Sequence, residues 1–136
     1  MKKLPAMYII AALLNWLWEH FHARLYVNYM GGAITEWILF RSAFFVDAVI
    51  IAALALVFIT IPYFSKRTWW VLVLGLIPAI IMEKYALATG RWMYGPHMPI
   101  VPFLDTGLTP TIQLAVTAYI SYLLVGLGST KKNVRT

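Results

Sequence analysis

The sequence predicts an all-α membrane protein with four transmembrane helices in one bundle, which form a single domain over residues 1–136. Hydrophobic residues make up 62% of the chain and charged residues 12%, a composition that excludes an ordinary soluble domain. The apolar residues come in long continuous runs, which favours helices and makes strands unlikely. A helix needs about 20 residues to cross a hydrocarbon core of about 30 Å, so the chain has room for four.

The four predicted helices span about residues 4–26, 36–63, 69–88 and 109–128. Gly31 and Gly32 mark a turn between the first two helices. Trp69 opens the third helix, where an interfacial tryptophan is expected. Thr109 is a suitable N-cap for the fourth helix, because Pro110 then takes the first helical position.

Clusters of basic residues predict how the bundle is oriented. They are Lys2 and Lys3, Lys66 and Arg67, and Lys131, Lys132 and Arg135. All three clusters fall on one side of the four-helix arrangement, and the flanks rich in Lys and Arg are normally cytoplasmic. Both termini are therefore expected in the cytoplasm, and the connections 24–35 and 90–108 outside. The net charge of +6 resides largely in these flanks, so we expect no nucleic-acid partner.

A polar stripe on the first helix is the most specific pattern in the chain. Asn15, Glu19, His22 and Tyr26 follow one another at spacings of four, three and four residues, which places them on one helical face. An ionisable residue within a span costs at least ~2.5 kcal/mol unless it faces protein or water. The stripe is therefore predicted to face the interior of the bundle.

The second helix repeats these spacings with Glu36, Phe40, Ala43 and Asp47, so these four residues are also predicted to share a face. Asp47 lies ~16 Å into its helix, near the middle of a bilayer. It is the deepest charged residue of the chain.

Two glutamates are predicted to line one cavity that opens towards the outer side. Glu19 lies 14 residues after Pro5 and Glu83 lies 14 residues after Trp69, so the two carboxyl groups reach similar depths in parallel helices. One hypothesis is that a neutral Glu19 acts as an acid and an ionised Glu83 as a base. The alternative is that the acidic residues only hold the helices together, through ion pairs with arginine, lysine or histidine.

The connection 90–108 is too apolar for an ordinary solvated loop. Pro96, Pro99 and Pro102 prevent a regular helix there, and its backbone cannot lie in lipid with unpaired polar groups. We expect an aromatic and proline-rich lid over the outer ends of the helices. The alternative is an interfacial anchor without a gating role.

The chain contains no cysteine, so a thiolate metal site is excluded. Glu19 and His22 form a Glu-x-x-His pair of the kind that di-iron bundles use twice, but Glu83 is followed at the third position by Ala86. We predict no metal and no cofactor. Metal or haem binding at His22, His20 or His97 is the weaker alternative.

The predicted function is to bind or process a lipid-like small molecule, such as an isoprenoid, a quinone or a lipid, within the bilayer. The candidate catalytic residues are Glu19, Glu83 and His22. The candidate ligand-binding residues are Asn15, Tyr26, Glu36, Arg41, Asp47, Arg91, Trp92, Tyr94 and Gln113. As an enzyme, the protein would catalyse acid-base chemistry of the cyclase, isomerase or hydratase type.

Two other classes of function stay open at this point. One is a proton-coupled carrier or channel in which Asp47 titrates near the midplane. The other is a non-catalytic subunit of a larger membrane complex, which the aromatic residues Trp37, Phe40, Phe44 and Phe45 of the second helix favour. Four short helices enclose little volume, so a homo-oligomer is also compatible with the sequence.

Overall fold

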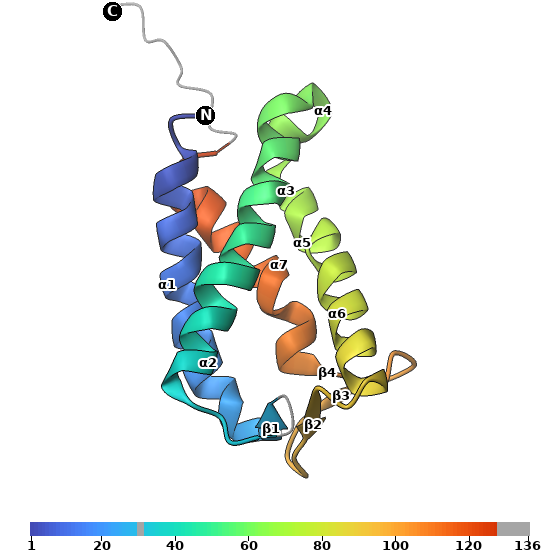
Figure 1. Cartoon of the computed structure of the whole chain (residues 1–136). Coiled ribbons are helices and arrows are strands. Elements are labelled where there is room, and N and C mark those ends of the chain that lie inside the picture. The colour runs from blue at the N-terminus through green and yellow to red at the C-terminus, as the bar shows by residue number, and fades with distance from the viewer. Residues whose placement is uncertain (30–31, 128–136) are drawn as a thin grey trace, which may run out of the picture.

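The computed structural model of the chain describes residues 1–29 and 32–127, and it is mostly helical, as the sequence predicts (Figure 1). The helical elements are α1 (Leu4–His22), η1 (Ala23–Leu25), α2 (Glu36–Arg41), η2 (Ser42–Asp47), α3 (Ala48–Thr60), α4 (Pro62–Ser65), η3 (Thr68–Trp70), α5 (Val71–Leu74), α6 (Leu76–Ala88) and α7 (Leu108–Leu124). Gly31 and the predicted basic cluster of the tail lie outside the described residues.

The first helix ends earlier than predicted, and the chain continues as a strand. α1 ends at His22, and after one 3-10 turn the strand β1 (Tyr26–Tyr29) pairs antiparallel with β2 (Trp92–Tyr94). The prediction that strands are unlikely is therefore wrong at this end of the molecule. The residues of β1 and β2 are mostly aromatic, a type that suits strands, and their pairing satisfies backbone groups that an open loop would leave without partners.

The second helix is continuous from Glu36 to Thr60 but contains a π-helical segment, η2, between α2 and α3. A π-helix has wider turns than an α-helix, so it rotates the residues that follow it. Glu36 is exposed and Asp47 is buried. Glu36, in the first turn, contacts His20 of α1, whereas Asp47 lies in the interior of the bundle. Thr35 caps the helix, since its side chain accepts a hydrogen bond from the Ile38 amide at 3.3 Å.

The third helix is divided at Gly75 into α5 and α6. Pro78 has no amide hydrogen, so it cannot donate to the carbonyl of Leu74 four residues earlier. Gly75 also lies against α7, because a Cβ atom there would be 2.7 Å from the Ala115 Cα atom. The break and the absent side chain together allow this helix to approach α7 closely.

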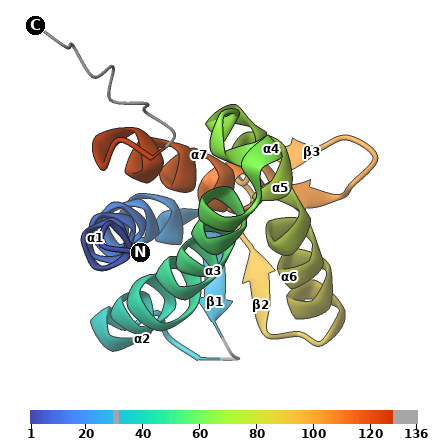
Figure 2. The same ribbon diagram turned by 90° about the horizontal axis from the view of Figure 1, so that it is seen from above.

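α7 is the central helix of the bundle. It packs against α1 on one side and against α5 and α6 on the other, while α1 also packs against η2 and α3 (Figure 2). The fully buried side chains at the end of the bundle away from β1 include Met7, Ile51, Phe58, Val71 and Tyr122. Compared with the predicted range of about 109–128, the fourth helix starts one residue early, at Leu108, and also ends early, at Leu124.

Two helices are long and apolar enough to cross a membrane by length and composition, namely Glu36–Thr60 and Thr68–Ala88. The apolar helix α7 is shorter, with 17 residues. Several polar side chains of α1, among them Glu19, lower the mean hydropathy of that helix. Of the four predicted spans, two thus have this support from the structure.

The connection between α6 and α7 forms strands at the end of the bundle where β1 lies (Figure 1). After β2, strand β3 (Ile100–Val101) pairs with β4 (Thr106–Gly107). The hairpin between them carries two residues with left-handed backbone, Phe103 (φ 69°) and Asp105 (φ 57°). The side chain of Phe103 is completely exposed at its tip.

Candidate functional site

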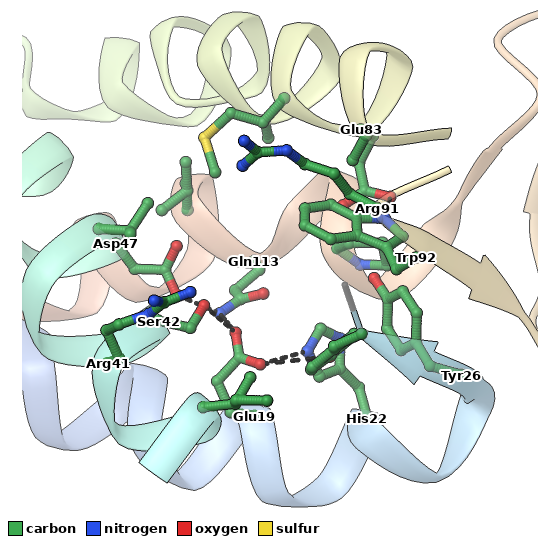
Figure 3. Close-up of a pocket in the computed structure, with 18 of the residues that line it drawn as sticks. Glu19, His22, Tyr26, Arg41, Ser42, Asp47, Glu83, Arg91, Trp92 and Gln113 are labelled. Atoms are coloured by element: carbon green, nitrogen blue, oxygen red, sulfur yellow. Dashed lines mark hydrogen bonds and ion pairs between the residues drawn. The ribbon is translucent and has the colours of Figure 1, made fainter. Parts of the chain in front are cut away.

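A cavity of about 200 Å³ lies between α1, α2 with η2, α6 and α7 (Figure 3). Its polar and charged lining residues are Glu19, His22, Tyr26, Tyr29, Arg41, Ser42, Asp47, Glu83, Tyr85, Arg91, Trp92 and Gln113. Its apolar lining residues are Ile38, Val46, Ala79, Met82, Ala86, Pro110 and Leu114. Side chains from every major helix except α3 and α5 thus meet around one space.

Glu19 is buried on the α1 wall and is surrounded by hydrogen-bond donors. Its Oε2 atom accepts from His22 Nε2 at 3.1 Å and from the Tyr29 hydroxyl at 3.4 Å. Its Oε1 atom accepts from Gln113 Nε2 at 2.9 Å and from the Ser42 hydroxyl at 3.5 Å. Four donors on two oxygen atoms match the acceptor capacity of a carboxylate.

His22 connects Glu19 to the start of α7. While its Nε2 atom faces Glu19, its Nδ1 atom lies 3.2 Å from the Thr109 hydroxyl. The tautomer that donates from Nε2 to Glu19 leaves Nδ1 to accept from Thr109. The imidazole is thereby held at both nitrogens, and its ring packs edge-on against Tyr26, with centroids 5.3 Å apart.

Asn15 helps to hold the side-chain amide of Gln113, which lines the cavity, in one orientation. Asn15 Nδ2 donates to the Ala11 carbonyl at 2.8 Å and to the Thr117 hydroxyl at 3.1 Å, which uses both of its hydrogens. Asn15 Oδ1 must then accept, and Gln113 Nε2 lies 3.0 Å from it. The Thr117 hydroxyl is a second donor within reach of the same atom, at 3.2 Å.

Glu19 and Asp47 both face the side-chain nitrogen of Gln113. Gln113 Nε2 lies 2.9 Å from Glu19 Oε1 and 3.0 Å from Asp47 Oδ2. An amide NH₂ group has two hydrogens, but here it faces three acceptors. The count of hydrogens closes if the Thr117 hydroxyl donates to Asn15 Oδ1, or if one of the two carboxyl groups is protonated.

Glu83 occupies the opposite wall and is held by the β2 strand. Its Oε2 atom accepts from Trp92 Nε1 at 3.2 Å and from the Tyr94 hydroxyl. The Tyr94 oxygen in turn accepts from the Gly107 amide at 2.8 Å. Burial raises the pKa of Tyr94 above its ordinary value, so the hydroxyl stays protonated and remains a donor to Glu83.

Four aromatic residues close the cavity where β1 and β2 pair. Tyr26 packs edge-on against Tyr29 and Tyr94, with ring centroids 4.8 and 5.4 Å apart. Tyr29 also packs against Trp92 at 5.9 Å. Edge-to-face contacts of this kind stabilise aromatic clusters beyond their buried area. The strands thus form a lid-like wall over this end of the helices.

The structure brings most of the sequence-predicted site residues together. Those that line the cavity are Glu19, His22, Tyr26, Arg41, Asp47, Glu83, Arg91, Trp92 and Gln113. Asn15 and Tyr94 stand directly behind this lining, hydrogen-bonded to Gln113 and Glu83. Glu36 lies elsewhere, since it is exposed and pairs with His20 Nε2 at 2.7 Å outside the cavity.

The three histidines lie at three separate places. His22 lines the cavity, His20 pairs with Glu36 away from it, and His97 is exposed in the connection before β3. Within residues 1–29 and 32–127, no three residues of the types His, Cys, Asp and Glu are grouped to hold a metal ion.

Several cavity residues were not anticipated from the sequence. Tyr29 donates to Glu19 from within the predicted connection 24–35. A prediction of the strand from Tyr26 to Tyr29 would have been needed to find it. Ser42 reaches Glu19 from the first turn of η2. No local pattern in the sequence indicates the π-helical segment, so nothing could have identified Ser42.

Comparisons with known proteins provide no relative for this chain. No protein-family model matches it, and neither a curated protein nor a solved structure does.

Proposed function

We propose that this chain is an integral membrane protein of four spans whose cavity binds a lipid-like small molecule. The observation that carries the proposal is that carboxyl groups from three helices, Glu19, Asp47 and Glu83, are enclosed in one cavity inside a bundle with an apolar exterior. Ionisable side chains within membrane spans are costly and commonly mark ligand or proton pathways.

The distribution of side chains supports insertion into a membrane. The buried polar residues include Asn15, Glu19, His22, Asp47, Glu83, Thr111, Gln113, Thr117 and Ser121. The exposed apolar residues include Ile9, Leu13, Leu17, Phe45, Val49, Val73, Ile77, Ile81, Leu123 and Leu124. So many exposed apolar side chains on several helices are unusual for a soluble monomer, and lipid would cover them.

Helix lengths and basic flanks support four spans with both termini in the cytoplasm. α1 and α7 have 19 and 17 residues, or ~28 and ~26 Å, close to the thickness of the hydrocarbon core. Lys3 Nζ donates to the Gly126 carbonyl at 2.6 Å, so the start of α1 and the end of α7 lie on one side. Lys66 and Arg67, next to α4, lie at the same end (Figure 1).

The size and lining of the cavity favour an amphiphilic ligand. About 200 Å³ is below the ~300–1,000 Å³ of sites that enclose a drug-sized molecule. A polar group would enter the cavity while the hydrocarbon part of the ligand remains among the helices and lipid. Glu19 and Glu83 would contact that polar group, and Met82 and Leu114 would contact the adjoining carbon atoms.

Acid-base chemistry on such a ligand is compatible with these side chains. Glu19 and Glu83 approach from opposite walls, and His22 bridges Glu19 to Thr109. A positioned acid and base on either side of a substrate contribute typically 10²–10⁴-fold each to a proton transfer. A cyclase, isomerase or hydratase type of reaction would use both.

Native mass spectrometry of the gently solubilised protein, with identification of retained molecules, tests the proposal. We expect the wild type to retain an isoprenoid, a quinone or a lipid. Glu19→Gln and Glu83→Gln should each lower this retention about tenfold. Lys84→Gln, an exposed change on α6, is the control. A wild-type protein without a retained ligand, or equal retention in all variants, would overturn the proposal.

A proton-coupled carrier is the second candidate, and the hydrogen count around Gln113 favours it. Asp47 is buried in the cavity lining, and it and Glu19 both accept from the Gln113 nitrogen, so the pair could gain or lose a proton as its surroundings change. In proteoliposomes, Asp47→Asn should abolish ligand-driven proton movement while ligand retention persists. Proton movement that survives in this variant would exclude Asp47 as the coupling group.

A further inference from the structure

The position of the cavity opening follows from which of the residues that line the cavity are exposed. All lining residues from α1, β1 and α7 are buried: Glu19, His22, Tyr26, Tyr29, Pro110, Gln113 and Leu114. The exposed lining residues are Arg41 and Val46 on α2 and η2, Tyr85 on α6, and Arg91 just after α6. The cavity therefore opens sideways, between the α2–η2 segment and α6.

The packing of the helices is consistent with a sideways opening. α1 packs against η2 and α3, and α7 packs against α1, α5 and α6. α7 thus closes one side of the space between the α2–η2 segment and α6. β1 and β2 lie between α2 and α6 at one end of this space (Figure 2). The side between η2 and α6 is the one that α7 does not cover.

The opening extends from the β1–β2 end of the bundle towards its middle. At a rise of about 1.5 Å per residue, Val46 lies ~15 Å from the start of its helix, and Tyr85 lies ~5 Å from the end of α6. Arg41 lies ~8 Å deep on the same scale, and Arg91 follows the end of α6. In a bilayer, the inner part of this opening would face hydrocarbon and its arginines would lie near the head groups.

The charges at the rim differ in sign from those inside. Arg41 and Arg91 are exposed at the opening, whereas Glu19, Asp47 and Glu83 are buried beyond it. The Arg91 guanidinium lies over the Tyr85 ring, 5.4 Å from its centroid, which holds it beside the opening. Guanidinium groups bind phosphate oxygens in a bidentate manner, so the rim suits an anionic head group.

We infer that the opening framed by Arg41, Val46, Tyr85 and Arg91 is a lateral portal for a lipid with a phosphate head group. The lipid enters from the leaflet at the β1–β2 end, its phosphate binds Arg41 and Arg91, and its chain passes Val46 and Tyr85 into the bilayer. This inference rests on the proposed function, because it names the ligand class and the entry route of the same cavity.

The head-group part is tested by native mass spectrometry from mixed micelles that hold equal amounts of phosphatidylglycerol and of diacylglycerol, which lacks the phosphate, with identical chains. We expect the wild type to retain phosphatidylglycerol preferentially, and Arg41→Gln combined with Arg91→Gln to lower that preference about tenfold. Lys66→Gln combined with Lys84→Gln removes the same amount of charge outside the cavity lining, and this variant should keep the preference for phosphatidylglycerol. Equal loss in both double variants would overturn the phosphate assignment. A parallel series with a long-chain alkyl phosphate distinguishes a bilayer phospholipid from another phosphorylated amphiphile.

The lateral route is tested by narrowing the portal without changing charge. Val46→Trp should lower retention of phosphatidylglycerol about tenfold, whereas Ile81→Trp, on an exposed position of α6 outside the cavity lining, should not. Thermal unfolding of both variants shows whether the fold persists. Wild-type retention in Val46→Trp would overturn the portal alone, while a wild type that retains no lipid-like molecule at all would overturn the proposed function itself.

Discussion

Gln113 is the residue on which the buried polar groups of three helices depend. Its side-chain nitrogen lies 2.9–3.0 Å from Asn15, Glu19 and Asp47, so a single amide joins α1, η2 and α7. Each of these acceptors is buried. Glu19 and Asn15 keep other donors when the amide is removed, so the loss falls mainly on the Asp47 carboxyl group. A buried polar group that loses its donor costs more than the net value of the hydrogen bond.

Gln113→Leu and Asp47→Asn should therefore differ in stability. We expect Gln113→Leu to lower the free energy of unfolding by about 3–5 kcal/mol, because it takes a donor from the buried Asp47 carboxyl group and places an apolar side chain beside two carboxyl groups. Asp47→Asn should cost under about 1 kcal/mol, because an amide supplies the hydrogen that a shared proton supplies in the wild type. Denaturant titration in detergent checks this, and equal losses would exclude a shared proton.

Tyr94 gives a prediction about alkaline pH. Burial, and then the hydrogen bond to Glu83, raise the pKa of Tyr94 above the ordinary value of 10.0. A group whose folded pKa exceeds its unfolded pKa stabilises the fold fully below the unfolded value, and this stability is lost as pH rises through the folded value.

The melting temperature should thus fall as pH rises above about 10, and part of the fall should disappear in Tyr94→Phe. This variant should also be less stable at neutral pH by about 1–2 kcal/mol, since it loses the bonds to Glu83 and Gly107. Melting curves from about pH 8 to pH 12 measure both effects. Identical pH dependence in the two proteins would show that other groups cause the fall.

At the scale of the elements, the close approach of α5 and α6 to α7 depends on Gly75. A Cβ atom at this position would lie 2.7 Å from Ala115 Cα and 2.8 Å from the Val71 carbonyl oxygen. Both neighbours are backbone atoms, so neither can move as an isolated side chain does. Relief of the Ala115 contact requires α7 to move away, and relief of the Val71 contact requires α5 to change its own backbone.

Gly75→Ala is therefore expected to destabilise the protein by about 1–3 kcal/mol. Gly32→Ala is the matched control, since a Cβ atom there meets nothing within 4 Å, and its effect should stay within about 0.5 kcal/mol. Thermal unfolding of both variants measures the difference. A neutral Gly75→Ala would mean that α7 and the third helix have room to separate at this crossing.

The π-helical segment η2 determines which polar residues of the second helix reach the cavity. Glu36 lies before this segment, and Ser42 and Asp47 are its first and last residues. Asp47 and Ser42 contact the Glu19 cluster, and Glu36 stays outside with His20. π-helical turns are frequent at functional sites, which fits the position of η2 beside the cavity.

At the scale of the whole molecule, the proposed orientation can be tested because the chain contains no cysteine. Ser65→Cys lies beside the basic loop at the proposed cytoplasmic end. Met93→Cys lies at the exposed position of β2, at the other end of the bundle. A membrane-impermeant maleimide added to intact cells should label Met93→Cys and leave Ser65→Cys unlabelled until the cells are lysed. The opposite pattern would reverse the orientation, and labelling of both would contradict a spanning bundle.

The sequence by itself determined the helical class, the polar stripe of α1 and most of the cavity residues. These follow from local periodicity, because a buried carboxyl group must face the interior wherever its helix lies. The basic flanks are likewise recognised from the sequence alone. The membrane orientation that they indicate stays a prediction.

Only the tertiary structure decided how these parts meet. β1 pairs with β2, more than 60 residues away in the chain, and such a contact has no local signal. The π-helical segment and the sharing of Gln113 between two carboxyl groups also depend on neighbouring helices. The physical reason is that hydrogen bonds between distant segments are set by packing, whereas periodicity records only which side of each segment is buried.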